Sequence, residues 1–398
     1  MAGQVFTQSE MEELWLDIEH MVTPSWVTPV PTKLGTSGHG KLKVDQWRVL
    51  GTAYLPMTLT RLWAKTDETA LSQRRQQILE ATHSLVTAVN IASSRTTSCL
   101  AANMYQNNIL TYIVQVKELF PDYRFRPNHH MAIHLHEYLH FYGPVHSWWT
   151  FPFERVIDML QRITTNYITG QYEKTIAFSF NRAARLRALL SKDTCPPELQ
   201  NCRDMFERLV KPDARSVSMM DMFGFLPQTD DFDDEDDGED ESYRTLERQC
   251  QLPDEIREAF KDSDIAEAPD TASLLDQLII NGIKYTVFSR NAGNSHILIS
   301  NAATDPLIPA QIEHIIQTKD PSCYLVVRCH LPADVSYNPF QDFPGCRAQM
   351  LVLNEHDECL IVIQPEHVRS HFASCPVKWE DKNINIAISM AKEYNVAK

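Results

Sequence analysis

The sequence lacks the features of membrane and secreted proteins. It contains no run of about eighteen apolar residues, the minimum for a transmembrane helix. Its first residues carry acidic side chains where a secretory signal carries basic ones. We therefore expect an intracellular protein with no membrane partner.

The nine cysteines include no Cys-x-x-Cys pair, and their number is odd. A disulfide framework needs an even number, and a zinc ribbon needs closely spaced pairs. We therefore interpret the cysteines as reduced thiols, as is usual inside cells.

The net charge of −15 is concentrated in one segment. Residues 1–220 hold 23 basic and 20 acidic side chains, whereas residues 221–274 hold 4 and 19, and residues 275–398 hold 10 and 13. The acidic run at Asp230–Glu241 repels itself and predicts a disordered linker. Three regions follow: 1–220, the acidic linker 221–274, and 275–398. Within the first, residues 33–220 carry 23 bases and 15 acids, which favours DNA as a partner.

The first region is expected to be helical. Apolar residues recur at three- and four-residue spacing, and prolines mark the ends of several segments. Pro56 is expected to kink or split the second helix. The predicted helices are Glu10–Met21, Asp45–Trp63, Thr69–Ala92, Thr97–Phe120, Glu154–Tyr167 and Gln171–Leu190.

The third region changes to short runs rich in Val, Ile, Tyr and Cys, which predict strands. Asn354–Glu358 is expected to be a hairpin loop, and Pro309–Gln317 an inserted helix. The spacing suits a small β-rich domain such as a barrel, with a protein partner as its default function. The fold class is therefore α+β. The expected strands are Ile283–Phe288, Ile297–Ser300, Tyr324–His330, Ala348–Leu353 and Cys359–Ile363.

A histidine-rich stretch, His129–Glu154, contains a zinc-enzyme pattern. His136, His140 and His146 stand at the spacing His-Glu-x-x-His-x-x-Gly-x-x-His, which can supply three imidazole ligands to Zn²⁺. Glu137 would act as the base that deprotonates a zinc-bound water. A zinc metallopeptidase is one hypothesis, although the residues before this stretch predict helices where such enzymes have a sheet.

A different set of residues in the same order resembles the C-terminal half of CACTA-type (En/Spm-like) transposases of fungal genomes. The resemblance covers roughly residues 22–190, and His130, His134 and His146 belong to its pattern, whereas His136, Glu137 and His140 occupy variable positions. The matching stretches are Pro24–Val27, Gly40–Arg48, Tyr54–Pro56, Leu119–Pro121, Pro127–Met131, Gly143–Trp149, Phe151–Arg155, and Asn166 with Gly170, Gln171 and Glu173.

The resemblance implies an RNase H-like core in which an Asp-Asp-Glu triad holds two Mg²⁺ or Mn²⁺ ions for DNA strand transfer. Residues 1–220 would supply the insertion and last helices of that core. Glu154 would be the final metal-binding carboxylate, with His130 and His134 supporting the site. The resemblance also implies a nuclear location.

In full-length relatives the two aspartates precede the Pro24–Val27 segment, and no residue here matches them. We therefore expect a truncated transposase without autonomous catalysis or a cofactor of its own, whose remaining activity would be weak binding of DNA or protein. An adopted interaction module is a further alternative, in which the β-rich domain binds a protein.

Overall fold

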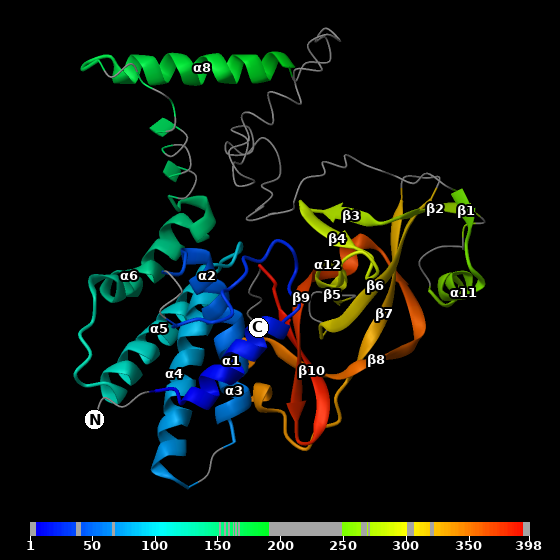
Figure 1. The fold of residues 1–398 in the computed structure, drawn as a ribbon, viewed down its shortest axis with the longest axis horizontal. Helices are drawn as coiled ribbons and strands as arrows, with labels where there is room; N and C mark the ends of the chain where they lie inside the picture. Colours follow the sequence, from blue (N-terminus) through cyan, green and yellow to red (C-terminus); the bar gives the residue numbers. More distant parts are fainter. Residues whose placement is uncertain are drawn as a thin grey trace. The chain divides into compact units, whose positions relative to one another are not determined.

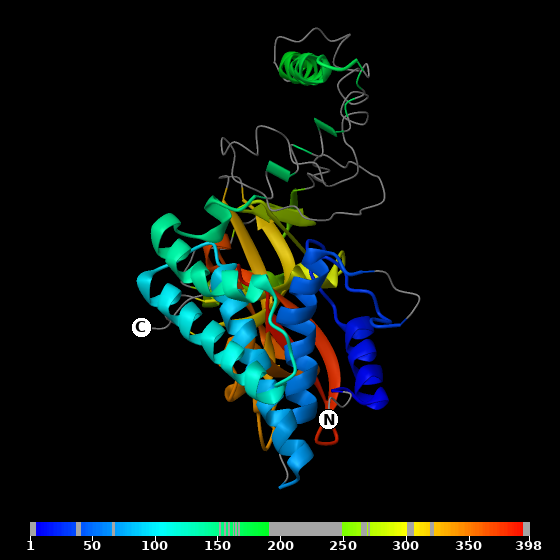
Figure 2. The ribbon, with the colours of Figure 1, turned by 90° about the vertical axis from the view of Figure 1, so that its left-hand side faces the viewer.

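The chain forms two compact units, which are residues Met1–Ser147 together with Gly238–Lys398, and residues Trp148–Asp237. A computed structural model (Figures 1 and 2) describes 5–36, 41–65, 68–150, 153–154, 157, 160–161, 163, 165, 168–190, 249–263, 269, 271–300, 306–318 and 322–392. The acidic run at 230–241 lies outside these residues, as does most of the expected helix 154–167. The structure shows a mixed α+β chain.

The helices of the first unit begin and end close to the expected positions. Their ends are set by local chemistry: the hydroxyls of Thr7, Thr69 and Ser98 accept hydrogen bonds from backbone N–H groups of the helices that follow them. The helices are α1 (Gln8–His20), α2 (Val44–Val49), α3 (Leu55–Trp63), α4 (Ala70–Ala92), α5 (Cys99–Leu119) and α6 (Pro127–Tyr142).

Pro56 does interrupt the second predicted helix. A π-helical turn, η1 (Leu50–Tyr54), connects α2 to α3, and Pro56 lies in the first turn of α3. Proline is tolerated there because its missing N–H would have no partner in a first turn.

The C-terminal strands form a barrel-like antiparallel sheet. Its order is β1-β2-β6-β5-β9-β10-β8-β7, and an additional β6–β7 pairing closes a ring of six strands. Buried Ile297, Ile312, Leu325 and Val327, from β5, β6 and β7, belong to one hydrophobic cluster. The ring consists of β5 (His296–Ile299), β6 (Ile308–Gln317), β7 (Cys323–Pro332), β8 (Ala348–Ile363), β9 (Val368–Trp379) and β10 (Lys382–Ser389).

Smaller elements surround the ring. A two-stranded sheet pairs β3 with β4, and α11 packs on the side of β8. They are β1 (Gln249–Gln251), α11 (Asp254–Asp262), β2 (Thr271–Leu275), β3 (Gln277–Ile280), β4 (Ile283–Thr286), α12 (Ala292–Ser295), and the 3₁₀ turns η2 (Val145–Ser147), η3 (Pro339–Gln341), η4 (Pro344–Cys346) and η5 (Pro365–His367).

The N-terminal helices and the barrel share one hydrophobic core. Leu14 and Ile18 of α1 pack with Ile384 and Ile386 of β10, and α1 lies beside β9 (Figure 1). The segment after α1 adds a backbone bridge between Val22 and Ser374 of β9. The helical region and the β-rich region are therefore parts of one packed unit.

Two local expectations for the barrel are wrong. Residues 309–317 belong to strand β6 and form no helix. A β-bulge between Ile312 and His314 shifts the register, so that Ile312, Ile315 and Ile316 are all buried. Their three- and four-residue spacing imitates a helical stripe, although a bulged strand produces it.

The expected hairpin loop at 354–358 is also wrong, because these residues lie inside the 16-residue strand β8. Residues 348–352 pair with β10, and residues 360–363 pair with β7. Asn354, with φ of 59°, lies between these two stretches, and β7 also pairs with Leu351 and His356. The sheet also begins earlier in the chain than residue 275, because β1 pairs with β2 and β2 with β6.

The second unit contains α8 (Tyr172–Leu190), close to the helix expected at 171–190. In the part of the chain that the structure describes, no helix is long and apolar enough to cross a membrane.

Candidate nucleic-acid interface and histidine-rich helix

The histidine-rich stretch forms most of α6. Pro127 occupies the first turn, and the backbone N–H of Arg126 donates to Nδ1 of His129 at 3.2 Å. The helix ends at Gly143, whose φ of +76° is accessible to glycine at little cost. The inner face carries Leu139, which is 3% exposed and packs with α4 and α5. The remaining faces of α6 thus present its histidines toward solvent.

His130 and His134 lie one helical turn apart and approach each other. Their Nε2 atoms are 3.3 Å apart, and the ring planes are nearly perpendicular, at 80°. On the opposite side of the His134 ring, Nδ1 lies 3.6 Å from Oε1 of Glu137. Three side chains at positions i, i+4 and i+7 therefore form one row.

The three histidines of the zinc-enzyme pattern, His136, His140 and His146, do not form such a row. His136 Nδ1 lies 3.2 Å from the carbonyl oxygen of Ile133, and the His136 and His140 rings are 6.2 Å apart. His146 lies in η2, where its Nε2 is 3.0 Å from the carbonyl oxygen of Ser93. Across the described ranges, no three His, Cys, Asp or Glu side chains are arranged to hold a metal ion. The structure does not bring His136, His140 and His146 together.

The turn between α5 and α6, residues 120–126, carries a cluster that we call the aromatic–basic turn and that includes the adjacent His129. Tyr123 and Phe125 are 45% and 36% exposed, and their rings pack edge to face at 5.4 Å. The His129 ring is 5.2 Å from that of Phe125. Arg124 and Arg126 are exposed between and beside these rings. The turn therefore exposes both aromatic rings and cationic groups.

Two contacts fix the base of this turn. The guanidinium of Arg74, from α4, lies 5.5 Å from the centre of the Phe120 ring, and its Nη2 donates to the carbonyl oxygen of Leu119 at 3.4 Å. Tyr105 of α5 donates its hydroxyl to the carbonyl oxygen of Ala132 at 2.7 Å. The turn thus extends from three packed helices, α4, α5 and α6, which run from blue to blue-green in Figure 2.

A protein-family model, "Domain of unknown function (DUF4218)", matches residues 93–181. No curated protein and no solved structure matches the chain. The matched residues include α5, the aromatic–basic turn, α6 and Glu154. The match therefore contains the candidate site residues that we identified from the sequence. The description of the family assigns no function to them.

Glu154 belongs to the second unit, and the histidines of α6 belong to the first. Its side chain is exposed, and its backbone N–H donates to the carbonyl oxygen of Thr150 at 2.9 Å. In α8 of the same unit, Arg182 and Arg185 are exposed, and the side chain of Arg187 lies outside the described residues.

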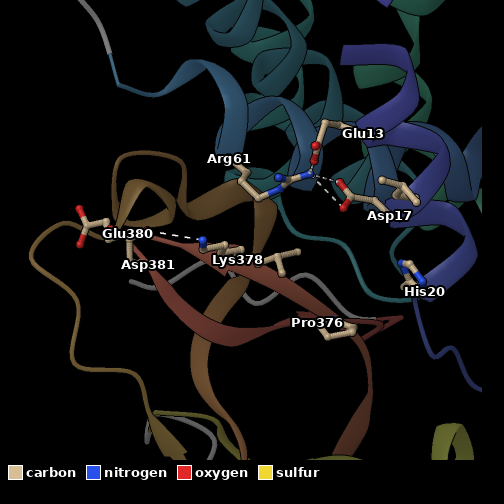
Figure 3. A pocket seen from close by; sticks show the side chains of 10 residues that line it. Glu13, Asp17, His20, Arg61, Pro376, Lys378, Glu380 and Asp381 are labelled. Atoms are coloured by element: carbon tan, nitrogen blue, oxygen red, sulfur yellow. Dashed lines mark hydrogen bonds and ion pairs between the residues drawn. The ribbon is translucent and has the colours of Figure 1, made fainter. Parts of the chain in front are cut away.

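The first unit also has a polar cleft of about 500 Å³ between α1, α3 and the β9–β10 turn (Figure 3). Nη2 of Arg61 donates to Asp17 Oδ2 and Glu13 Oε2, both at 2.9 Å. Thr58 donates its hydroxyl to Asp17 at 2.6 Å. Burial raises the pKa of Asp17, and the neighbouring Arg61 opposes this rise.

The polar floor of the cleft is thus already paired within the protein. Lys378 and Asp381 on the opposite wall are likewise 3.5 Å apart. We interpret the cleft as a joint between α1, α3 and the barrel.

Sequence reasoning selected His130, His134 and Glu137 but missed the aromatic–basic turn. The available signal was the alternation Tyr-Arg-Phe-Arg at residues 123–126 between two helices. Aromatic residues that alternate with arginine outside a helix do not fit the pattern of a hydrophobic core. This alternation could have identified the turn from the sequence.

Proposed function

We propose that the chain is a transposase-like protein of the CACTA type that binds DNA through the aromatic–basic turn. Its helical region would be the insertion and last helices of an RNase H-like core, and its location would be the nucleus. The observation that carries the proposal is that Arg124 and Arg126 are exposed and alternate in sequence with the exposed Tyr123 and Phe125.

The chemistry of the turn suits a nucleic acid. Guanidinium groups bind phosphates bidentately, and exposed aromatic faces stack on bases that are unpaired or splayed. No ion pair joins Arg124 or Arg126 to an acidic side chain among the residues described, so both cations are available to phosphates. The turn also lies within residues 33–220, the segment with a basic excess.

Binding, and not strand cleavage, is the activity that we propose for this chain. Two-metal cleavage requires several carboxylates around one point. Glu154 is an exposed acid, and the described parts of the chain hold no group of three metal-ligating side chains.

The salt dependence of DNA affinity tests the proposal. Fluorescence anisotropy with a labelled DNA duplex measures log K against log salt concentration, and each phosphate contact contributes about 0.9 to the slope. Arg124→Gln/Arg126→Gln is expected to reduce the slope by about 1.8 and to weaken binding at low salt. The matched control is Arg290→Gln/Lys378→Gln, because it removes the same charge from the barrel, where both cations are ion-paired. An equal slope for the double variant and the wild-type protein would contradict the proposed surface.

A cleavage assay addresses the catalytic alternative. The purified chain is incubated with labelled terminal-repeat DNA and Mg²⁺ or Mn²⁺, beside Glu154→Gln. We expect no cleavage from either protein. Cleavage that is lost in Glu154→Gln would show that Glu154 works as a catalytic carboxylate and would refute a purely binding role.

A further inference from the structure

The two histidines at the start of α6 have the geometry of a metal chelate. With bonds of about 2.1 Å from zinc to each imidazole nitrogen, the 3.3 Å separation between Nε2 of His130 and Nε2 of His134 corresponds to an N–Zn–N angle of about 104°. That angle is close to the tetrahedral value. The distance between the two nitrogens therefore allows both to bind a single ion.

Glu137 adds the second feature of such sites. A histidine that binds a metal through one ring nitrogen usually donates its other N–H to a carboxylate, which fixes the tautomer and orients the ring. Oε1 of Glu137 lies 3.6 Å from Nδ1 of His134, and Nε2 of the same ring faces His130. The carboxylate is thus placed behind the ligand and leaves the metal position open.

The nearby pair His136 and His140 has the same sequence spacing and lacks this geometry. The rings of His136 and His140 are 6.2 Å apart, compared with 4.8 Å for His130 and His134. Nδ1 of His136 lies against the carbonyl oxygen of Ile133, at 3.2 Å. The second pair therefore provides an internal control on the same helix.

We propose that His130 and His134 bind one divalent transition-metal ion of the Zn²⁺ class, with Glu137 as a positioning residue. The side chains of His134 and Glu137 are 39% and 49% exposed, so water can complete the coordination shell. Imidazole ligands in this arrangement select Zn²⁺, Ni²⁺ and Cu²⁺ over Mg²⁺ and Ca²⁺, which prefer oxygen. This site differs from the expected zinc-enzyme pattern in both of its ligands.

Isothermal titration of the chelator-treated full chain with ZnCl₂ tests the site, at about pH 7.5 because metal binding requires unprotonated imidazole. His130→Gln/His134→Gln is expected to lose one bound ion per chain, or to bind it at least tenfold more weakly. His136→Gln/His140→Gln removes two histidines from the same helix and is expected to keep that ion. Glu137→Gln is expected to weaken binding about tenfold, the lower end of such outer-shell effects.

Circular dichroism of each variant shows whether α6 is retained. If His130→Gln/His134→Gln disturbs the helix, the single variant His134→Gln gives the same comparison with only one change. Unchanged stoichiometry and affinity in the folded His130 and His134 variants would overturn the proposal, as would loss of the ion in His136→Gln/His140→Gln alone. Absence of any bound ion in the wild-type chain would show that the two rings only share a hydrogen bond.

Discussion

Replacement of His330 by phenylalanine is predicted to remove part of the acid sensitivity of the barrel. His330 lies in β7 and is 7% exposed, and neither of its ring nitrogens has a hydrogen-bond partner. Its neighbours are the rings of His356 at 4.3 Å, Phe372 at 5.6 Å and His296 at 5.8 Å. Burial lowers the pKa of His330, the neighbouring His356 and His296 act in the same direction, and together these effects bring it to about 3.

The sign of the effect follows from the two protonation states. The ring is neutral in the folded protein, whereas in the unfolded chain it binds a proton below its ordinary pKa of 6.5. The contribution to stability is therefore fully present above pH 6.5 and is lost as the pH falls toward 3. Between pH 6.5 and pH 5 the loss is about 2 kcal/mol for one such histidine, at about 1.36 kcal/mol per pH unit.

Urea unfolding of the full chain at about pH 7.5 and about pH 5 measures this loss. His330→Phe is expected to lose about 2 kcal/mol less than the wild-type protein over this interval. At the higher pH it should also be more stable, because an unpartnered buried polar group costs about 1–3 kcal/mol. The control is His20→Gln, which replaces an exposed histidine and should leave the pH dependence unchanged. Equal losses in His330→Phe and the wild-type protein would refute a neutral, unpartnered His330.

Two further substitutions test contacts of the N-terminal segment within the first unit. Gly293→Ala places a Cβ atom 2.0 Å from the carbonyl oxygen of Thr23, so it should lower the unfolding free energy by about 3 kcal/mol or more. The control is Gly51→Ala, whose Cβ atom meets no atom within 4 Å. It should leave the unfolding free energy unchanged in the same thermal-unfolding assay. Arg61→Met leaves the buried carboxylate of Asp17 without its cation and should cost about 3–5 kcal/mol. The double variant Arg61→Met/Asp17→Asn should recover much of that loss, and failure to recover would show that the ion pair contributes little.

The helical part of the fold followed from local sequence signals because its determinants are local. Thr69 caps α4, Pro56 interrupts the second helix, and the apolar stripe of α5 ends at Pro121. Hydroxyl caps and prolines act within one turn of the chain, so a sequence shows them directly. The packing of α1 against β10 could not be predicted from local signals, because Leu14 and Ile384, which share a hydrophobic cluster, lie far apart in the sequence.

The strands of the barrel were predicted less well than the helices, because their structure depends on which strands pair with one another. A bulge in β6 produced helical spacing of buried residues, and the polar residues 354–358 look like a loop although they continue β8. Both cases depend on which strand lies alongside. Hydrogen-bond partners that come from distant sequence decide the structure there, and local propensity does not.

The histidines of α6 show how far spacing alone can indicate a site. His130 and His134 share the i, i+4 spacing with His136 and His140, so the sequence offers the two pairs equally. The pairs differ in what the rings meet: a backbone carbonyl oxygen lies beside Nδ1 of His136, whereas a carboxylate lies behind His134. The pattern His-Glu-x-x-His drew attention to Glu137 as a base for the pair that flanks it. In the structure the same carboxylate lies beside the other pair, and a side chain on the next turn of the helix therefore decides which histidines can act together.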